Sequence, residues 1–306
     1  MSKIKFNRKV LTLATVFALM LAALAFYGTT AGEVYAAGND VTVTFQAESN
    51  DNTFFVKPKE VTVSPGYAAT IKSTWTNSSA TVGPNGVSAL DVLAKIHHNK
   101  YGAAFDNNPT AYIRGSASYI TGMFGQTNES LPSSGIMFGV NNVQPNDGIV
   151  HEWTWNGVTT YGYMTYAINQ AKVENGDHVN YFFLKDSDYL DYYTYFTDNN
   201  GNPKYKINMR RNTSVNLKLK GYKYFEDGYK VSWPVYNISG VPIKYLNQGG
   251  DGYSATMGNT IVNAGSNTNG SFRFTAPSTP GTYYISASGT YAGKPIVPPC
   301  LEIKVR

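Results

Sequence analysis

The aromatic residues between positions 153 and 163 are the part of this sequence best suited to hold a ligand. Trp153 and Trp155 are two residues apart, so an extended chain places both indoles on the same face. Tyr161 and Tyr163 follow in the same segment. Such rings stack on flat ligands, sugar rings or partner peptides. The competing interpretation is that one or both indoles close a hydrophobic core.

The four histidines and the single cysteine do not predict reactive sites. His97 and His98 are adjacent, and adjacent residues on a helix point about 100° apart, so they do not readily share a metal; His151 and His178 add no zinc-ligand spacing. We expect His97 to be a hydrogen-bonded core residue. Cys300 begins an alternating terminal segment and is predicted to be buried, and one cysteine excludes an intramolecular disulfide.

The carboxylates do not predict a metal site or an acid pair. Asp186, Asp188 and Asp191 could hold calcium, but their spacing lacks the glycine of a calcium-binding hand and favours a solvated turn. Acids for glycoside hydrolysis could be drawn from Glu152, Asp177 or Asp186, as from any chain. No nucleophile elbow, phosphate loop or dinucleotide fingerprint is present. We therefore predict no catalytic residue, no metal and no cofactor.

Residues 1–36 have the composition of a secretion signal peptide. A basic head precedes the apolar run 10–26, and a small-x-small cleavage site ends at Ala36. An uncleaved anchor is the alternative, but the run is short for a membrane span. The remaining chain has 21 Lys and Arg against 19 Asp and Glu, so nucleic acid is not an expected partner. We predict an extracellular or cell-surface protein without a transmembrane span after cleavage.

One helix is predicted, from a cap at Ser88 to a terminating Gly102. Asp91 follows the cap by three residues, where a carboxylate favours the exposed amides. Most other segments of the first half alternate with a period of two, which predicts strands. The expected strands are 41–47, 61–63, 119–123, 136–140, 163–168 and 178–184, with a further extended piece at 69–75. One helix among strands predicts an α+β domain in which the helix covers one face of a sheet.

The second half contains only strand signals. Residues 198–203 break every periodic pattern and predict the end of the first domain. The strand-like segments after this break are 215–219, 272–274, 283–287 and 301–305. Short alternating segments separated by turns are typical of a β-sandwich. The aromatic residues 189–196 are expected to pack in a core or at a domain interface.

The first half contains an ordered series of motifs. These are Ser88-Ala89-Leu90-Asp91-Val92-Leu93, Tyr119-Ile120-Thr121-Gly122, Gly135-Ile136-Met137-Phe138-Gly139-Val140-Asn141-Asn142, Pro145-Asn146-Asp147 and Val173-Glu174-Asn175-Gly176-Asp177-His178-Val179. The series resembles bacterial domains similar to the carboxy-terminal domain of transcobalamin. The resemblance implies a β-grasp-like, soluble-ligand-binding module over residues 37–200. In transcobalamin itself, this domain covers one side of a bound corrinoid.

The second half carries a different resemblance. Ala276-Pro277 followed by Pro280-Gly281-Thr282-Tyr283-Tyr284 resembles the late strands of bacterial immunoglobulin-like domains. The predicted fold is therefore an α+β β-grasp-like domain with one main helix, followed by an all-β immunoglobulin-like sandwich at 201–306. Such an architecture is found in secreted and surface proteins of Gram-positive anaerobes.

The leading functional hypothesis is a secreted or cell-surface, non-enzymatic binding protein. The resemblance and the aromatic set together predict a ligand site made by Phe138, Asn141, Asn142, Trp153, Trp155, Tyr161 and Tyr163. The expected partner is a small molecule such as a corrinoid, a glycan, or a peptide of a surface protein. The alternative is a structural surface protein or adhesin that self-associates through its β domains, a class in which an intramolecular Lys–Asn crosslink is a further hypothesis. A secreted hydrolase has the least support.

Overall fold

The computed structural model describes residues 39–49, 53–71, 86–116, 118–128, 135–155, 158–224, 234–265 and 269–306. Within these ranges the chain is mostly β-strand, with three short or medium α-helices, so the expectation of a β-rich protein is confirmed. The predicted signal peptide, 1–36, lies outside the described residues.

The first half is built on four strands in one sheet. Their order is β2 (Phe54–Val63), β1 (Val41–Glu48), β11 (His178–Leu184) and β7 (Gly135–Val140). β1 is parallel to β11, while the two outer pairs are antiparallel. Because successive side chains point to opposite faces, one face of β1 and β11 meets a helix and the other face meets the second half of the chain.

Helix α3 (Ala89–Tyr101) covers one face of this sheet, as predicted. Ser88 accepts a hydrogen bond from the Asp91 amide at 3.2 Å, and Asp91 accepts one from the Ser88 amide at 2.9 Å, which completes a capping box. Asp91 is fully buried and also accepts the amide of Ala68 at 2.7 Å. The cap therefore holds the helix to the segment that follows β2.

That segment differs from the prediction. Residues 69–75 were expected to be extended, but the structure has the short helix α2 (Tyr67–Thr70) after the turn at Gly66, and residues 72–75 are outside the described part. Tyr67 begins the helix and Ala68 packs in the core. The other small elements of the first half are β3 (Val87–Ser88), α4 (Ala103–Asn107), η2 (Pro109–Ala111), β4 (Arg114–Gly115), β5 (Ile120–Met123), β6 (Gln126–Thr127) and β10 (Lys172–Val173).

The second half consists of two packed layers of strands. One layer has the order β13 (Lys206–Met209), β22 (Cys300–Val305), β19 (Gly281–Ala287), β16 (Pro242–Gln248) and β17 (Ala255–Asn263). The other has the order β15 (Tyr236–Asn237), β14 (Ser214–Lys223), β12 (Tyr192–Thr197), β21 (Lys294–Val297) and β20 (Thr290–Tyr291), with β18 (Ser271–Thr275) also paired to β14. Apolar residues from both layers form one core.

Strand β12 joins the second half although it precedes residue 200. It pairs antiparallel with β14 and parallel with β21. The chain then crosses to the other layer, where β13 runs parallel to β22. The Asp-Asn-Asn-Gly-Asn-Pro break at 198–203 is therefore a crossing loop between two strands of the same half.

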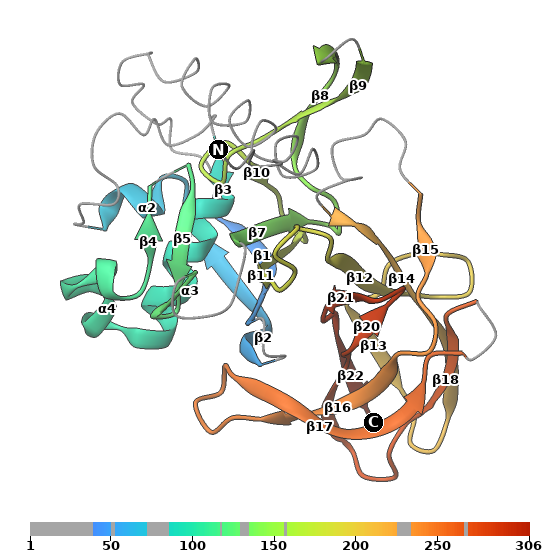
Figure 1. The fold of residues 1–306 in the computed structure, drawn as a ribbon. Helices are drawn as coiled ribbons and strands as arrows, with labels where there is room; N and C mark the ends of the chain where they lie inside the picture. Colours follow the sequence, from blue (N-terminus) through green and yellow to red (C-terminus); the bar gives the residue numbers. More distant parts are fainter. Residues whose placement is uncertain are drawn as a thin grey trace, which may run out of the picture.

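The two halves share a continuous nine-stranded sheet. β17 of the second half meets β2 of the first half through the pair Ala255 and Phe54. Figure 1 shows the helical layer and the two-layered β half on either side of this junction. A cluster of Phe54, Leu246, Ala255, Tyr284 and Cys300 fills the space beneath it, which confirms that Cys300 is buried.

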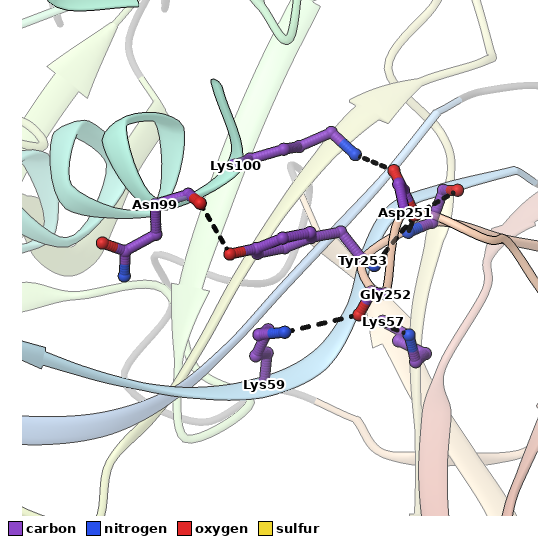
Figure 2. Close-up of polar contacts among 8 residues, drawn as sticks. Lys57, Lys59, Asn99, Lys100, Asp251, Gly252 and Tyr253 are labelled. Atoms are coloured by element: carbon purple, nitrogen blue, oxygen red, sulfur yellow. Dashed lines mark hydrogen bonds and ion pairs between the residues drawn. The ribbon is translucent and has the colours of Figure 1, made fainter. Parts of the chain in front are cut away.

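The loop 249–254 between β16 and β17 reaches across this junction (Figure 2). The Tyr253 hydroxyl donates to the carbonyl oxygen of Asn99 at 2.7 Å, near the end of α3. The Lys59 ammonium lies 4.0 Å from the centre of the Tyr253 ring, a cation–π contact. One tyrosine thus joins the loop to both the helix and β2 of the first half.

Two further lysines of the first half bind the same loop (Figure 2). The Lys57 ammonium donates to the carbonyl oxygen of Gly252 at 2.7 Å, and Lys100 forms an ion pair with Asp251. Burial lowers the pKa of Lys57, while the ion pair and amide hydrogen bonds lower the pKa of Asp251 despite partial burial. These contacts fix the orientation of one half against the other.

Candidate binding surface

The β8–β9 hairpin of the first half forms a two-stranded sheet of its own. β8 (Asn146–Trp155) and β9 (Val158–Thr165) pair with each other and with no other described strand. In Figure 1 the two green strands extend away from both halves of the molecule. The predicted strand 163–168 overlaps only the end of β9, and β8 was not predicted at all.

One face of this hairpin presents apolar side chains to solvent. Directly opposed residues of an antiparallel pair share a face, and Val150 is opposite Tyr163 while Glu152 is opposite Tyr161. Tyr161 is 55% exposed and Val150 is 51% exposed, whereas Tyr163 is half-buried. We call Val150, Glu152, Tyr161 and Tyr163 the hairpin face. Ile149, at 60% exposure, adjoins it where the register shifts.

The two tryptophan positions do not belong to the hairpin face. Trp153 is paired with Thr160, and Trp155 is paired with Val158. These positions alternate with that of Glu152 along β8, so the register puts them on the other face of the hairpin. Their side chains lie outside the described part of the structure. The prediction that both tryptophans share a site with Tyr161 and Tyr163 therefore falls in part on side chains outside the described part.

Polar contacts hold the base of the hairpin. The Asp147 carboxylate accepts the Ile149 amide at 3.1 Å and lies 2.6 Å from His151 Nε2. Asn146 accepts the amide of Gly148 at 2.9 Å. Although partial burial opposes ionisation, the contact with His151 and the amide hydrogen bonds lower the pKa of Asp147. The ionised carboxylate thus stabilises the first residues of β8.

The predicted residue Asn141 maintains a turn. Asn141 has φ 53°, in the left-handed region that asparagine tolerates better than most residues. Its amide donates to Asp177 at 2.6 Å, and its side-chain oxygen accepts the His178 amide at 2.9 Å. These bonds connect the end of β7 to the start of β11. The Asn141 side chain therefore forms hydrogen bonds within the chain that stabilise this turn.

Asn142, also left-handed with φ 66°, lies at the junction of the two halves. Its amide donates to the Tyr205 hydroxyl, its side-chain oxygen accepts from Tyr193 at 3.3 Å, and its carbonyl accepts from Tyr222 at 3.1 Å. All three tyrosines come from the second half. Asn142 is buried, so its predicted contact with an external ligand is replaced by contacts within the chain.

Phe138 is buried in the same region. Its ring stacks on Tyr181 with centres 5.5 Å apart, and its carbonyl accepts a hydrogen bond from Tyr224. Phe138, Asn141 and Asn142 are thus brought together with one another but not with the exposed Tyr161. The prediction that residues 189–196 include packing aromatics is confirmed by Tyr193, which is buried in a cluster with Phe182 and Tyr222.

A buried polar network continues along the junction. Glu48 accepts a hydrogen bond from Asn180 at 3.1 Å, and burial raises the pKa of Glu48 well above its ordinary value. His178 Nε2 lies 3.1 Å from Gln46 Oε1, and its ring stacks on Tyr205 at 4.0 Å. Burial lowers the pKa of His178 to about 3, so the imidazole is neutral at neutral pH. The alternation of residues 41–47 gives no sign of this network, because a strand with one buried face is expected to expose its polar side chains to water.

The remaining reactive residues have structural partners. His97 is buried, as predicted, with Nδ1 2.7 Å from the Leu93 carbonyl and Nε2 accepting the Phe124 amide at 3.0 Å. Asp186 forms an ion pair with Lys294 at 2.8 Å. The prediction of a solvated turn is wrong for Asp191, which is buried and accepts backbone amides because the turn folds over it. Among the described residues, no group of three His, Cys, Asp or Glu side chains is arranged to hold a metal.

Two comparisons with known proteins found no relative of this chain. No protein-family model matches the chain, and a comparison with curated proteins gives no significant match. In the described ranges, no helix has the length and apolar character needed to cross a bilayer.

Proposed function

We propose that the protein is a non-enzymatic, extracellular binding protein that contacts its partner through the hairpin face. The exposure of Val150 and Tyr161 on a hairpin outside both sheets is the observation that carries this proposal. Apolar side chains clustered at the surface are typical of interaction sites, and tyrosine combines a large ring with a polar hydroxyl. Phe138 and Asn142 support the site indirectly by holding the two halves together.

The topology supports the finer fold assignment. A first hairpin, a covering helix and a last strand parallel to the first, in the order β2-β1-β11-β7, are the features of a β-grasp-like domain. In the second half, two facing layers with β12 in one and β13 in the other fit an immunoglobulin-like sandwich. With β12 included, this sandwich begins before residue 200.

The position of the hairpin face favours a large partner. Small-molecule sites are concave and enclose most of the ligand, whereas this face lies on a projecting pair of strands (Figure 1). Residues 115–171 contain no Lys or Arg, so the hairpin offers no cation to an acidic ligand. A glycan or a peptide segment of a surface protein therefore fits the face better than a corrinoid.

Binding of labelled mature protein to intact cells of its source organism tests this proposal. Tyr161→Ser combined with Val150→Thr removes the exposed apolar groups and is expected to weaken binding about tenfold, with little change in melting temperature. Val235→Thr is the matched control, because Val235 is 44% exposed outside the hairpin. Equal binding by the double variant and the control would overturn the proposal.

A second candidate is a structural surface protein that self-associates through strand edges. The outer edges of β8 and β9 have no ladder partner among the described strands, and such edges accept further strands. This candidate predicts an increase in the mass of the purified mature protein with concentration, measured by light scattering. A monomer at all concentrations would remove it.

A further inference from the structure

Charge is divided unevenly between the two halves of the chain. Residues 201–306 contain 13 Lys and Arg but four Asp and Glu, whereas residues 37–200 contain eight Lys and Arg and 15 Asp and Glu. The net charges are therefore +9 and −7. The nearly neutral total conceals a strongly basic second half, which produces a positive field of its own.

Some cations of the second half are neutralised at the junction. Lys206 lies 3.5 Å from Glu60, and Lys294 lies 2.8 Å from Asp186, with both carboxylates supplied by the first half. Part of the opposite charge of the two halves therefore serves to join them, through ion pairs across the junction. They do not involve the cations at the end of β13 and β22.

Those cations form a stripe on the outward face of the layer that contains β13 and β22. The parallel ladder of β13 and β22 continues past both strands, since the Arg306 amide donates to Met209 at 3.0 Å and the Arg211 amide donates to Arg306 at 3.2 Å. This pattern puts Arg210 opposite Arg306. Lys304, two residues before Arg306, belongs to the same face. We call Lys304, Arg306, Arg210 and the adjacent Arg211 the basic stripe.

The basic stripe is exposed and uncompensated. All four residues are exposed, and none has a carboxylate partner in the described part of the chain. None of the exposed large apolar residues belongs to the stripe. Arginine anchors of protein interfaces normally lie within a patch that has an apolar, aromatic core, so a surface made of four cations favours a polyanion over a folded protein.

The side chains of the basic stripe are suited to bind a polymer with one phosphate in each repeating unit. Three of the four cations are arginines, whose planar guanidinium binds phosphate through two parallel hydrogen bonds. Residues on one face of a strand are about 6.6 Å apart, and neighbouring strands are about 4.8 Å apart. The stripe therefore presents several cations at short, regular intervals, as a linear polymer with one charge per repeating unit requires.

We propose that the basic stripe binds a linear phosphodiester polymer of the cell envelope and retains the secreted protein at the surface. This inference rests on the proposed extracellular location, but it does not depend on the hairpin face. The two surfaces are on different halves of the molecule, so the polymer would hold the second half while the hairpin face remains available.

The test measures binding of the mature chain to immobilised synthetic poly(glycerol phosphate) over a range of salt concentrations. The wild-type affinity is expected to fall linearly on a logarithmic scale as salt increases, because bound phosphates release counterions. Arg210→Gln combined with Arg306→Gln is expected to weaken binding about tenfold. Lys220→Gln combined with Arg273→Gln is the control, since it removes the same charge from the other layer and is expected to change affinity less than about twofold.

Three results would overturn the proposal. They are no binding at low salt, equal weakening by the test and control variants, and equally tight binding to poly-glutamate of matched charge. Melting temperatures of all variants confirm that they are folded. The hairpin variant Tyr161→Ser, Val150→Thr is expected to bind the polymer like the wild type, which separates failure of this inference from failure of the proposed partner site.

Discussion

Replacement of Asn142 by alanine is expected to destabilise the protein by about 3 kcal/mol. The substitution leaves the hydroxyls of the buried Tyr193 and the half-buried Tyr205 without their Asn142 partner, at a cost of roughly 1 kcal/mol each. Alanine at φ 66° adds about 1 kcal/mol of backbone strain. Asn142→Gly removes the same hydrogen bonds but tolerates this φ, so we expect a loss of about 2 kcal/mol.

Urea unfolding of the mature chain, followed by intrinsic fluorescence, measures these differences. A loss of 3 kcal/mol corresponds to a decrease in melting temperature of roughly 6–12 °C for a chain of this size. Asn208→Ala, on the exposed side of β13, is the control and is expected to stay within about 0.5 kcal/mol of the wild type. If Asn142→Ala matched this control, the assignment of Asn142 to the junction would be refuted.

Two further predictions concern the junction and pH. Tyr253→Phe removes the hydrogen bond to Asn99 and is expected to cost about 1 kcal/mol in the same assay; an unchanged free energy of unfolding would argue against the loop contact. His97 and His178 have pKa values of about 3 in the folded protein, so lowering the pH from 6.5 protonates them only in the unfolded chain and destabilises the fold by up to about 1.4 kcal/mol per pH unit for each histidine. The raised pKa of Glu48 has the opposite effect above its ordinary value of 4.5, because the folded state then retains a proton that the unfolded state loses. Glu48→Gln is therefore expected to steepen the loss of stability between pH 6.5 and 5, and parallel pH profiles would contradict this assignment.

The helix and its core were predictable because their signals are local. Ser88, Asp91 and Gly102 form the two ends of α3 from residues close in sequence, and the buried His97 follows from the same periodicity. Alternation also predicted the central strands β1 and β11, since each has a face that packs against α3. The alternation of the terminal strand likewise predicted correctly that Cys300 is buried.

The junction was not predictable because its partners are distant in sequence. Asn142 contacts tyrosines 51 to 80 residues away, and a turn motif does not reveal such partners. Glu48 lies on a strand whose polar face meets the second half, so alternation gave the wrong environment. β8 was missed because a hairpin outside the core has no buried face to impose a clear alternation.

Tyrosine footprinting on intact cells tests the proposed hairpin face most directly. Tyr161 is exposed in the free protein, so a tyrosine-nitrating reagent should modify it rapidly, whereas the buried Tyr181 and Tyr222 should remain unmodified. When the mature protein is bound to the cell surface, nitration of Tyr161 is expected to fall severalfold, while that of the half-exposed Tyr291 in the second half stays constant. Undiminished nitration of Tyr161 in the bound protein would show that the partner contacts a different surface.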